Sequence, residues 1–88
     1  MKKIVFSQHA LSRLENRGTS KEEVEKAIRS GEVVPAKKGR VTFRKNFPFG
    51  LRWKGKYYQM KQVMPIAVEE KERIVVVTVY VYYFGGRK

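Results

Sequence analysis

The stretch that most constrains the fold is IVVVTVYVYYF, which runs from Ile74 to Phe84. It carries no charge and is rich in β-branched and aromatic residues, a composition typical of a buried strand. At eleven residues it is too short to cross a membrane as a helix. Its odd-numbered positions, from Val75 to Tyr83, are almost wholly apolar, so we expect this face to pack against helices, while the other face is apolar with hydroxyl groups. Such a strand needs neighbouring strands and a covering layer.

The beginning of the chain predicts a short strand and then a helix. Ile4 to Phe6 suits a strand, and Ser7 is a good N-cap for a helix over residues 8–17. Gly18 is a suitable stop for that helix. The apolar side of this helix, which we expect to face the core, consists of Ala10, Leu11 and Leu14.

A second helix is predicted almost immediately afterwards. Ser20 and Glu23 have the spacing of a capping box, and the helix should end at Gly31. Its expected buried stripe consists of Val24, Ala27 and Ile28.

From Val33 onward the pattern indicates β-structure. VVPAKKGRVTF predicts two strands joined by a turn at Lys38-Gly39, and residues 51–68 predict a second pair that turns at Lys54-Gly55. These pairs, followed by the strand from Ile74, predict an antiparallel sheet.

Two prolines predict irregularities in that sheet. In NFPFG, Pro48 and Gly50 should interrupt the pairing, and Pro65 favours an edge position or a bulge. With 88 residues there is room for one core only, so residues 1–88 should form a single domain. The expected class is α+β: a short N-terminal strand, two helices and an antiparallel sheet of about four strands.

The charge balance is the strongest global signal. Twenty Lys and Arg residues stand against eight acidic residues, all Glu, which gives a net charge of +12. No acidic residue occurs between Pro35 and Val68. Such a field attracts polyanions, most commonly nucleic acid, although an acidic protein partner or a need for solubility would also explain it. The residues that we expect to contact nucleic acid are Lys37, Lys38, Arg40, Arg44, Lys45, Arg52, Trp53, Lys54 and Lys56.

The composition argues against several other classes. There is no cysteine, so we expect a reducing, cytoplasmic environment without disulfides. The apolar run near the start is too short for a signal peptide, and no segment predicts a membrane anchor. One histidine without cysteine disfavours zinc, and no acidic cluster predicts a magnesium site. No glycine-rich phosphate loop is present, so neither a metal nor a cofactor is expected.

The first predicted helix carries the only histidine. At about 100° per residue, His9, Arg13 and Asn16 lie on one side, with Arg17 on the flank. An amphipathic helix needs a polar face, so this pattern alone is also that of an ordinary surface helix.

These side chains nevertheless suit the chemistry of RNA cleavage without a metal. A histidine can take the 2′-OH proton, and arginines can hold the phosphate and stabilise the phosphorane. Because there is one histidine only, the proton for the leaving 5′-oxygen must come from another group. Tyr80, Tyr82 or a lysine are the candidates.

Two stretches make the chain resemble a known family. FSQHALSRLENRGTSKEEVEKAIRSGEVV is similar to the opening of the domain-of-unknown-function family 4258, and VVTVYVYYF is similar to its last strand. The matching positions are Ser7, His9, Ala10, Arg13, Arg17, Gly18, Ser20, Glu23, Val24, Thr78 and Tyr80.

The resemblance implies a fold and an activity. The family is grouped with RelE-, barnase- and colicin-like ribonuclease toxins, which implies a RelE-like layered fold, a metal-independent ribonuclease and an acidic antitoxin partner. By the same resemblance, His9 and Arg13 are phosphate-binding or acid–base candidates. Arg17 has the same candidate role, or a role in packing or helix capping, and Thr78 and Tyr80 form the strand side of the site.

Three functions therefore stay open at this point. The first is a metal-independent endoribonuclease, the second a non-catalytic RNA-binding module, and the third a basic protein that binds an acidic antitoxin-like partner. If the helices cover the valine face of the last strand, Thr78 and Tyr80 point away from them, and His9 could meet these residues only around a sheet edge. The RNA target and the oligomeric state are not predicted.

Overall fold

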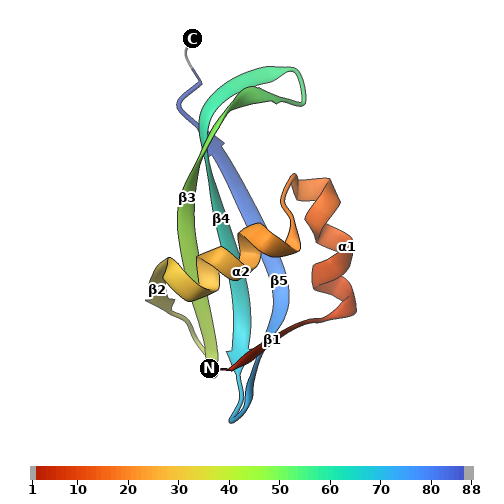
Figure 1. Cartoon of the computed structure of the whole chain (residues 1–88), viewed down its shortest axis with the longest axis vertical. Helices are drawn as coiled ribbons and strands as arrows, with labels where there is room; N and C mark the ends of the chain where they lie inside the picture. Colours follow the sequence, from red (N-terminus) through yellow and green to blue (C-terminus); the bar gives the residue numbers. More distant parts are fainter. Residues whose placement is uncertain (1, 87–88) are drawn as a thin grey trace.

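A computed structural model of the chain describes residues 2–86. Within them, one five-stranded sheet carries two helices on one of its faces (Figure 1). The elements, in chain order, are β1 (Lys3–Phe6), α1 (Gln8–Arg17), α2 (Lys21–Ser30), β2 (Glu32–Pro35), β3 (Arg40–Trp53), β4 (Lys56–Glu69) and β5 (Arg73–Phe84).

Local caps define α1 as predicted. The Ser7 hydroxyl accepts a hydrogen bond from the backbone N–H of Ala10 at 3.1 Å. At the other end, Gly18 has a left-handed backbone with φ of 78°, and its N–H donates to the Glu15 carbonyl at 3.1 Å. The predicted helix over residues 8–17 is confirmed because these end signals are local.

The start of α2 differs in one detail from the predicted capping box. The Ser20 hydroxyl accepts from the N–H of Glu23 at 3.2 Å, as expected. The Glu23 carboxylate, however, accepts from the Thr19 hydroxyl at 2.9 Å and pairs with Lys61 at 2.8 Å. The Glu23 carboxylate therefore pairs with Lys61 of the sheet and does not cap the helix.

The sheet is mixed, not antiparallel, and its strand order is β1-β5-β4-β3-β2. β1 adds to the edge of β5 in parallel, with Lys3 opposite Arg73 and Phe6 opposite Val76, whereas every other pairing is antiparallel. The four strands that follow the helices, β2 to β5, are antiparallel as predicted, whereas the parallel addition of β1 as a fifth strand of the same sheet was not predicted. A parallel pairing between the two ends of a chain leaves no turn signal in the sequence.

β3 and β4 form a long hairpin whose far end curls toward α1, giving a molecule of 45 × 23 × 23 Å (Figure 1). β3 continues through Pro48 and Gly50, so the predicted interruption is only a register shift between Pro48 and Leu51. β2 pairs no further along β3 than Arg44, which leaves Pro48 on an edge where proline is tolerated.

Pro65 is not at an edge. It is fully buried in β4, between β3 and β5. The predicted bulge is close by, as a register shift of β4 against β5 between Ile66 and Ala67.

This shift changes which face of β5 meets the helices. Thr78 pairs with Ile66 and Val76 with Ala67, so Val77 is the extra residue. The core side of β5 is consequently Ile74 and Val76 before the bulge and Val79 and Val81 after it. The predicted valine face is thus correct for the second half of the strand and wrong for Val75 and Val77.

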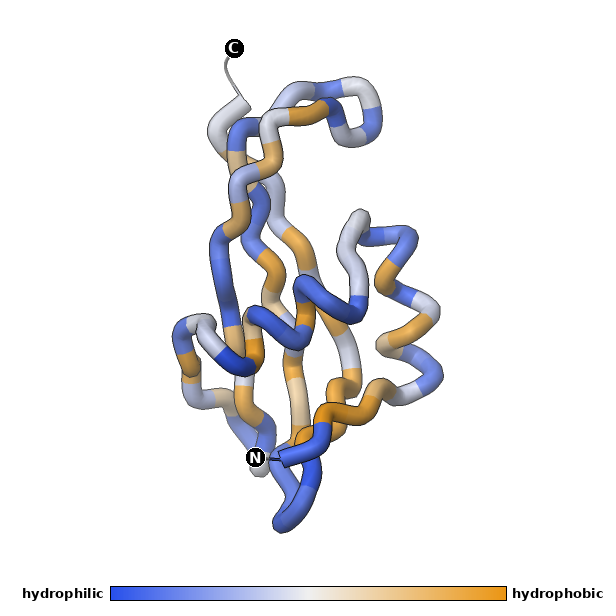
Figure 2. Tube along the Cα trace, in the orientation of Figure 1, coloured by the Kyte–Doolittle hydropathy of each residue, from blue (hydrophilic) through white to orange (hydrophobic). Residues whose placement is uncertain are grey.

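The core lies between the sheet and the two helices. Figure 2 shows hydrophobic residues in β1 and the middle of the sheet, and a hydrophilic turn between β4 and β5. Leu11, predicted to face the core, is 39% exposed, because α1 lies over the edge of the sheet and buries only a narrow stripe (Figure 1). The buried hydrophobic cluster consists of Ala10, Val24, Ile28, Phe43, Val63, Ala67, Val76 and Val79.

Candidate nucleic-acid interface

The end of the long hairpin packs onto the end of α1. The Trp53 ring stacks on the Tyr83 ring with centroids 5.1 Å apart, and the Tyr83 hydroxyl donates to the Arg17 carbonyl at 2.8 Å. A β-carbon at Gly18 would overlap the Tyr83 hydroxyl and lie 2.8 Å from two atoms of the Trp53 ring. Gly18 is therefore required both for its positive φ and for this close approach.

A buried lysine also stabilises this junction between the hairpin and α1. The Lys61 side chain is 8% exposed, and its ammonium group donates to the Gly18 carbonyl at 2.8 Å. The same group pairs with the Glu23 carboxylate at 2.8 Å and lies 5.4 Å from the centre of the Phe49 ring. The first contact joins β4 to the segment between the helices, the second joins β4 to α2, and the third lies within the hairpin itself.

Tyr83 is the central aromatic residue of this junction. Its ring also contacts Phe49 edge-on at 5.2 Å and Tyr58 at 5.5 Å. Burial, with a smaller effect of the Glu23 charge, raises the pKa of the Tyr83 hydroxyl to about 12. The hydroxyl therefore stays protonated at neutral pH and remains a hydrogen-bond donor to the helix end.

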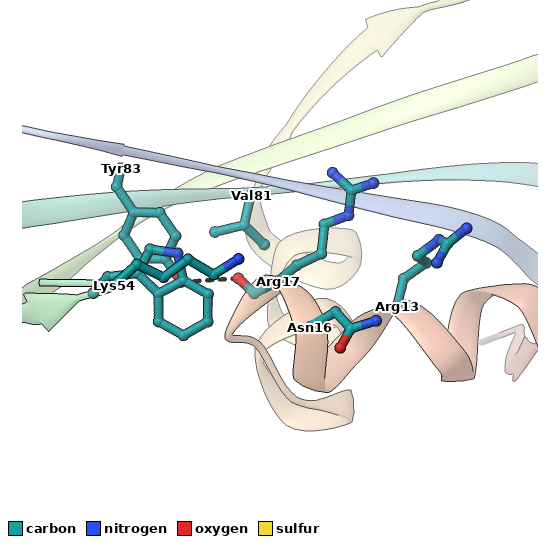
Figure 3. Close-up of a pocket in the computed structure, with 7 residues that line it drawn as sticks. Arg13, Asn16, Arg17, Lys54, Val81 and Tyr83 are labelled. Atoms are coloured by element: carbon teal, nitrogen blue, oxygen red, sulfur yellow. Dashed lines mark hydrogen bonds between the residues drawn. The ribbon is translucent and has the colours of Figure 1, made fainter.

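An open pocket of about 320 Å³ lies between α1 and the hairpin end (Figure 3). In Figure 3, Arg13, Asn16 and Arg17 project from α1 on one side, while Lys54 and Tyr83 lie on the other. The residues that line the pocket are Arg13, Asn16, Arg17, Trp53, Lys54, Val81 and Tyr83.

The pocket contains three cations and no acidic residue. Among the ion pairs formed within residues 2–86, none involves Arg13, Arg17 or Lys54. Lys54 instead lies over the Trp53 ring, with its nitrogen 5.5 Å from the ring centre. A cavity lined by two arginines and a lysine, with no acidic residue, suits an anion with several oxygens.

A known protein family matches most of this chain. The family model described as Domain of unknown function (DUF4258) matches residues 6–81. The chain belongs to the DUF4258 family. No curated protein and no solved structure gives a significant match.

Several residues that carry the DUF4258 resemblance have structural roles. Ser7 and Ser20 cap the helices, Gly18 allows the close approach of Trp53, and Glu23 pairs with Lys61. Ala10 and Val24 are fully buried in the core.

His9 and Arg13 differ from those DUF4258 residues. Within the described part of the chain, neither side chain has a hydrogen bond or an ion pair. His9 is exposed in the first turn of α1, one helical turn before Arg13, and it does not line the pocket.

The predicted strand residues lie elsewhere. Because Val79 and Val81 face the core, Thr78 and Tyr80 point to the sheet face opposite the helices. Arg17 connects the two sides: it lines the pocket, and its guanidinium carbon lies 5.0 Å from the centre of the Tyr80 ring. The structure thus brings Arg17 to Tyr80 around the edge of β5, and it does not gather His9, Thr78 and Tyr80 in one pocket.

The predicted basic surface is divided along β3. Lys37, Lys38 and Arg40 lie at the turn between β2 and β3, at the opposite end of the molecule from Lys54 (Figure 1). Fourteen residues of strand separate these ends, at about 3.3 Å per residue. The nine residues that we expect to contact nucleic acid therefore do not form one continuous surface.

The remaining predicted basic residues have different surroundings. Arg44 pairs with Glu32 at 2.8 Å, which raises the pKa of Arg44 and lowers that of Glu32. Lys45 lines a second pocket that also contains Glu32. Arg52 donates to the Gly55 carbonyl at 3.2 Å, and Lys56 is exposed beside it at the hairpin end.

Sequence reasoning missed Tyr83 and Lys61. Tyr83 sits on the face predicted to be core, where nothing marks it as part of a pocket. Lys61 had a usable signal, because it alternates with Val63, Pro65 and Ala67 on one face of β4. A single lysine in an apolar alternation predicts a buried and paired cation.

Residues 2–86 contain no group of three or more His, Cys, Asp or Glu side chains placed to hold a metal ion. In the same described range, neither helix has the length and apolar content needed to cross a membrane.

Proposed function

We propose that this protein binds RNA and that a backbone phosphate occupies the pocket between α1 and the hairpin end. The observation that carries the proposal is that Arg13, Arg17 and Lys54 line one cavity and have no acidic partner among the described residues. Two planar guanidinium groups from adjacent turns of a helix match the oxygens of a phosphodiester, and a lysine supplies a third charge.

The overall charge supports a polymeric ligand rather than a small anion. A net charge of +12 on 88 residues gives a long-range attraction to polyanions and a strongly salt-dependent affinity. Asn16, beside the arginines, adds a neutral donor and acceptor to the pocket without reducing its positive charge.

The test compares two variants that lose the same charge. One changes Arg13, Arg17 and Lys54 to Gln, and the other changes Lys26, Arg29 and Lys71, all exposed and outside the pocket, to Gln. Binding to a labelled single-stranded RNA is followed by fluorescence anisotropy at several salt concentrations. We expect the pocket variant to lose about 2 from the slope of log affinity against log salt, since each phosphate contact contributes roughly 0.7. Equal slopes for the two variants would contradict the proposal.

Cleavage of the bound RNA is the second candidate function. It is favoured by His9, which has no structural partner and lies one helical turn, about 5–6 Å between β-carbons, from Arg13. In this reaction His9 takes the 2′-OH proton, the 2′-oxygen attacks phosphorus, and the bond to the 5′-oxygen breaks. Arg13 and Arg17 stabilise the added negative charge on the phosphorane.

The proton for the departing 5′-oxygen needs a second group. Lys54 in the pocket and Tyr80 beneath Arg17 are the candidates, whereas Tyr83 already donates its proton to the Arg17 carbonyl. This chemistry, together with the α+β fold and the DUF4258 match, supports the proposal that the chain is related to RelE-, barnase- and colicin-like ribonuclease toxins. An acidic antitoxin would then be a competitor for the same cations.

The test for cleavage uses RNA in EDTA, because the reaction proposed needs no metal. The wild type should produce fragments ending in a 2′,3′-cyclic phosphate and should leave a 2′-deoxy oligonucleotide intact. His9→Ala should lose cleavage and keep binding, while Gln8→Ala, an exposed neighbour on the same helix, serves as the control. If the wild type binds the RNA without cleaving it, the cleavage function is wrong and only the RNA-binding function remains.

A further inference from the structure

The sheet face opposite the helices carries an exposed row of aromatic rings. After the bulge at Val77, the side chains of Tyr80, Tyr82 and Phe84 all point away from the core. Tyr82 is 49% exposed and Phe84 is 41% exposed. Both described helices bury their apolar residues in the single core on the other face, so no helix covers these rings.

The surroundings of this row are neutral. Across β4, Tyr80 pairs with Met64, Tyr82 with Gln62, and Phe84 with Met60. The acidic residues that flank the sheet lie in and beside the turn between β4 and β5, which is at the opposite end of β5. Packing does not explain why large apolar rings should stay in solvent at this end of the molecule.

Arg17 makes the row continuous with the phosphate pocket. Its side chain lines the pocket and also covers the Tyr80 ring from 5.0 Å (Figure 3 shows it extending from α1 across β5). β1 pairs with β5 only as far as Val76, so no strand of the described chain separates the pocket from the aromatic face along this edge. A flexible chain could therefore contact both surfaces.

We propose that Tyr82 and Phe84 stack with unpaired bases of single-stranded RNA whose phosphates bind at Arg13 and Arg17. This inference rests on the proposed RNA-binding function and adds the class of RNA. Residues two apart on a strand are about 7 Å apart, so each ring can stack with a base of its own. Paired bases of a duplex are already stacked inside the helix and cannot reach the rings.

The charge distribution favours this occupant over a second copy of the chain. Two copies meeting at this face would each bring a net charge of +12 and the unpaired Arg17 at its rim. RNA supplies the opposite charge at the rim and flat aromatic surfaces for the rings.

The experiment measures the affinity of a single-stranded RNA and of an RNA hairpin of equal length. Tyr82→Ser should weaken single-strand binding about tenfold, since stacking of one base contributes roughly 1–3 kcal/mol. The salt slope should not change, because the phosphate contacts remain. Val33→Ser, which removes a 58% exposed apolar side chain from β2, should have no effect.

A second measurement needs no variant. In the wild-type protein, the NMR signals of the Tyr82 and Phe84 ring protons should shift upfield on titration with the single strand and not with the hairpin. Unchanged ring signals, or equal single-strand affinity for Tyr82→Ser and the wild type, would overturn this inference while the pocket variant could still lose binding. A wild type without salt-dependent RNA affinity would overturn both proposals. If Tyr82→Ser instead turned a dimer into a monomer, the face would be a contact between copies, and the inference would be wrong.

Discussion

The Lys61 ammonium group donates to the Gly18 carbonyl at 2.8 Å, a contact between residues 43 positions apart in the sequence. It fixes the end of α1 against the middle of the long hairpin. Arg17 immediately precedes Gly18, so the same contact also fixes one wall of the candidate pocket.

Lys61→Met should destabilise the fold. It removes the cation that pairs with Glu23, whose side chain is only 28% exposed, and leaves the Gly18 carbonyl without that donor. We expect a loss of about 2 kcal/mol in the free energy of unfolding, measured by urea denaturation. The double variant Lys61→Met with Glu23→Gln should recover part of this loss, and a single variant as stable as the wild type would contradict the role of the pair.

Gly18→Ala should separate the hairpin end from α1. A β-carbon there meets Trp53 and Tyr83, and the positive φ is strained for alanine. We expect a loss of about 2 kcal/mol or more and a red shift of Trp53 fluorescence as the indole becomes more exposed. Gly39→Ala is the control, because it has a positive φ of 72° but no neighbour within 4 Å. Equal effects at the two glycines would show that only backbone strain matters.

Tyr83→Phe should reduce the dependence of stability on alkaline pH. The pKa of Tyr83 is about 12 in the folded protein and about 10 in an unfolded chain, so the folded state holds this proton more tightly. Its contribution is complete below about pH 10 and is lost as the pH rises toward 12. Denaturation midpoints between these pH values should therefore fall more steeply for the wild type than for Tyr83→Phe. Parallel curves would mean that the hydroxyl is not held by the fold.

Removing the charges at the turn between β2 and β3 should affect RNA binding little. Lys37→Gln, Lys38→Gln and Arg40→Gln together remove three charges from the end of the molecule opposite the pocket. Single-stranded RNA affinity should stay within about threefold of the wild type, because charges beyond a Debye length of roughly 10 Å are screened. A loss as large as that of the pocket variant, measured by the same anisotropy titration, would show that the RNA also contacts this end of the molecule.

Much of the fold could be predicted because its signals are local. The caps at Ser7, Gly18 and Ser20 define both helices within a few residues, and Lys54-Gly55 defines the hairpin turn. The parallel pairing of β1 could not be predicted, and Pro65 indicated a bulge without showing that Val77 of β5 is the extra residue, since both depend on contacts between distant strands. One extra residue at the bulge moved the first valines of β5 to the opposite face.

The candidate site was predictable only in part. Helical spacing placed Arg13 and Arg17 together, and the basic run included Trp53 and Lys54. The curl of the hairpin toward α1 joined these two sets, and the sequence carries no signal for that curl. The other basic residues of this run lie away from the pocket, because the run extends along one long strand whose ends are far apart.

The pairing of β1 with β5 has a consequence for how the protein is made. Lys3 pairs with Arg73, which is synthesised about 70 residues later, so the edge of the sheet cannot form before then. Contacts between residues so far apart in the sequence also form slowly in folding. Val81 and Tyr83, which line the pocket, are synthesised later still. A nascent chain that has not yet released β5 from the ribosome therefore lacks both a closed core and an assembled pocket, so the RNA binding that we propose would begin only after synthesis is complete.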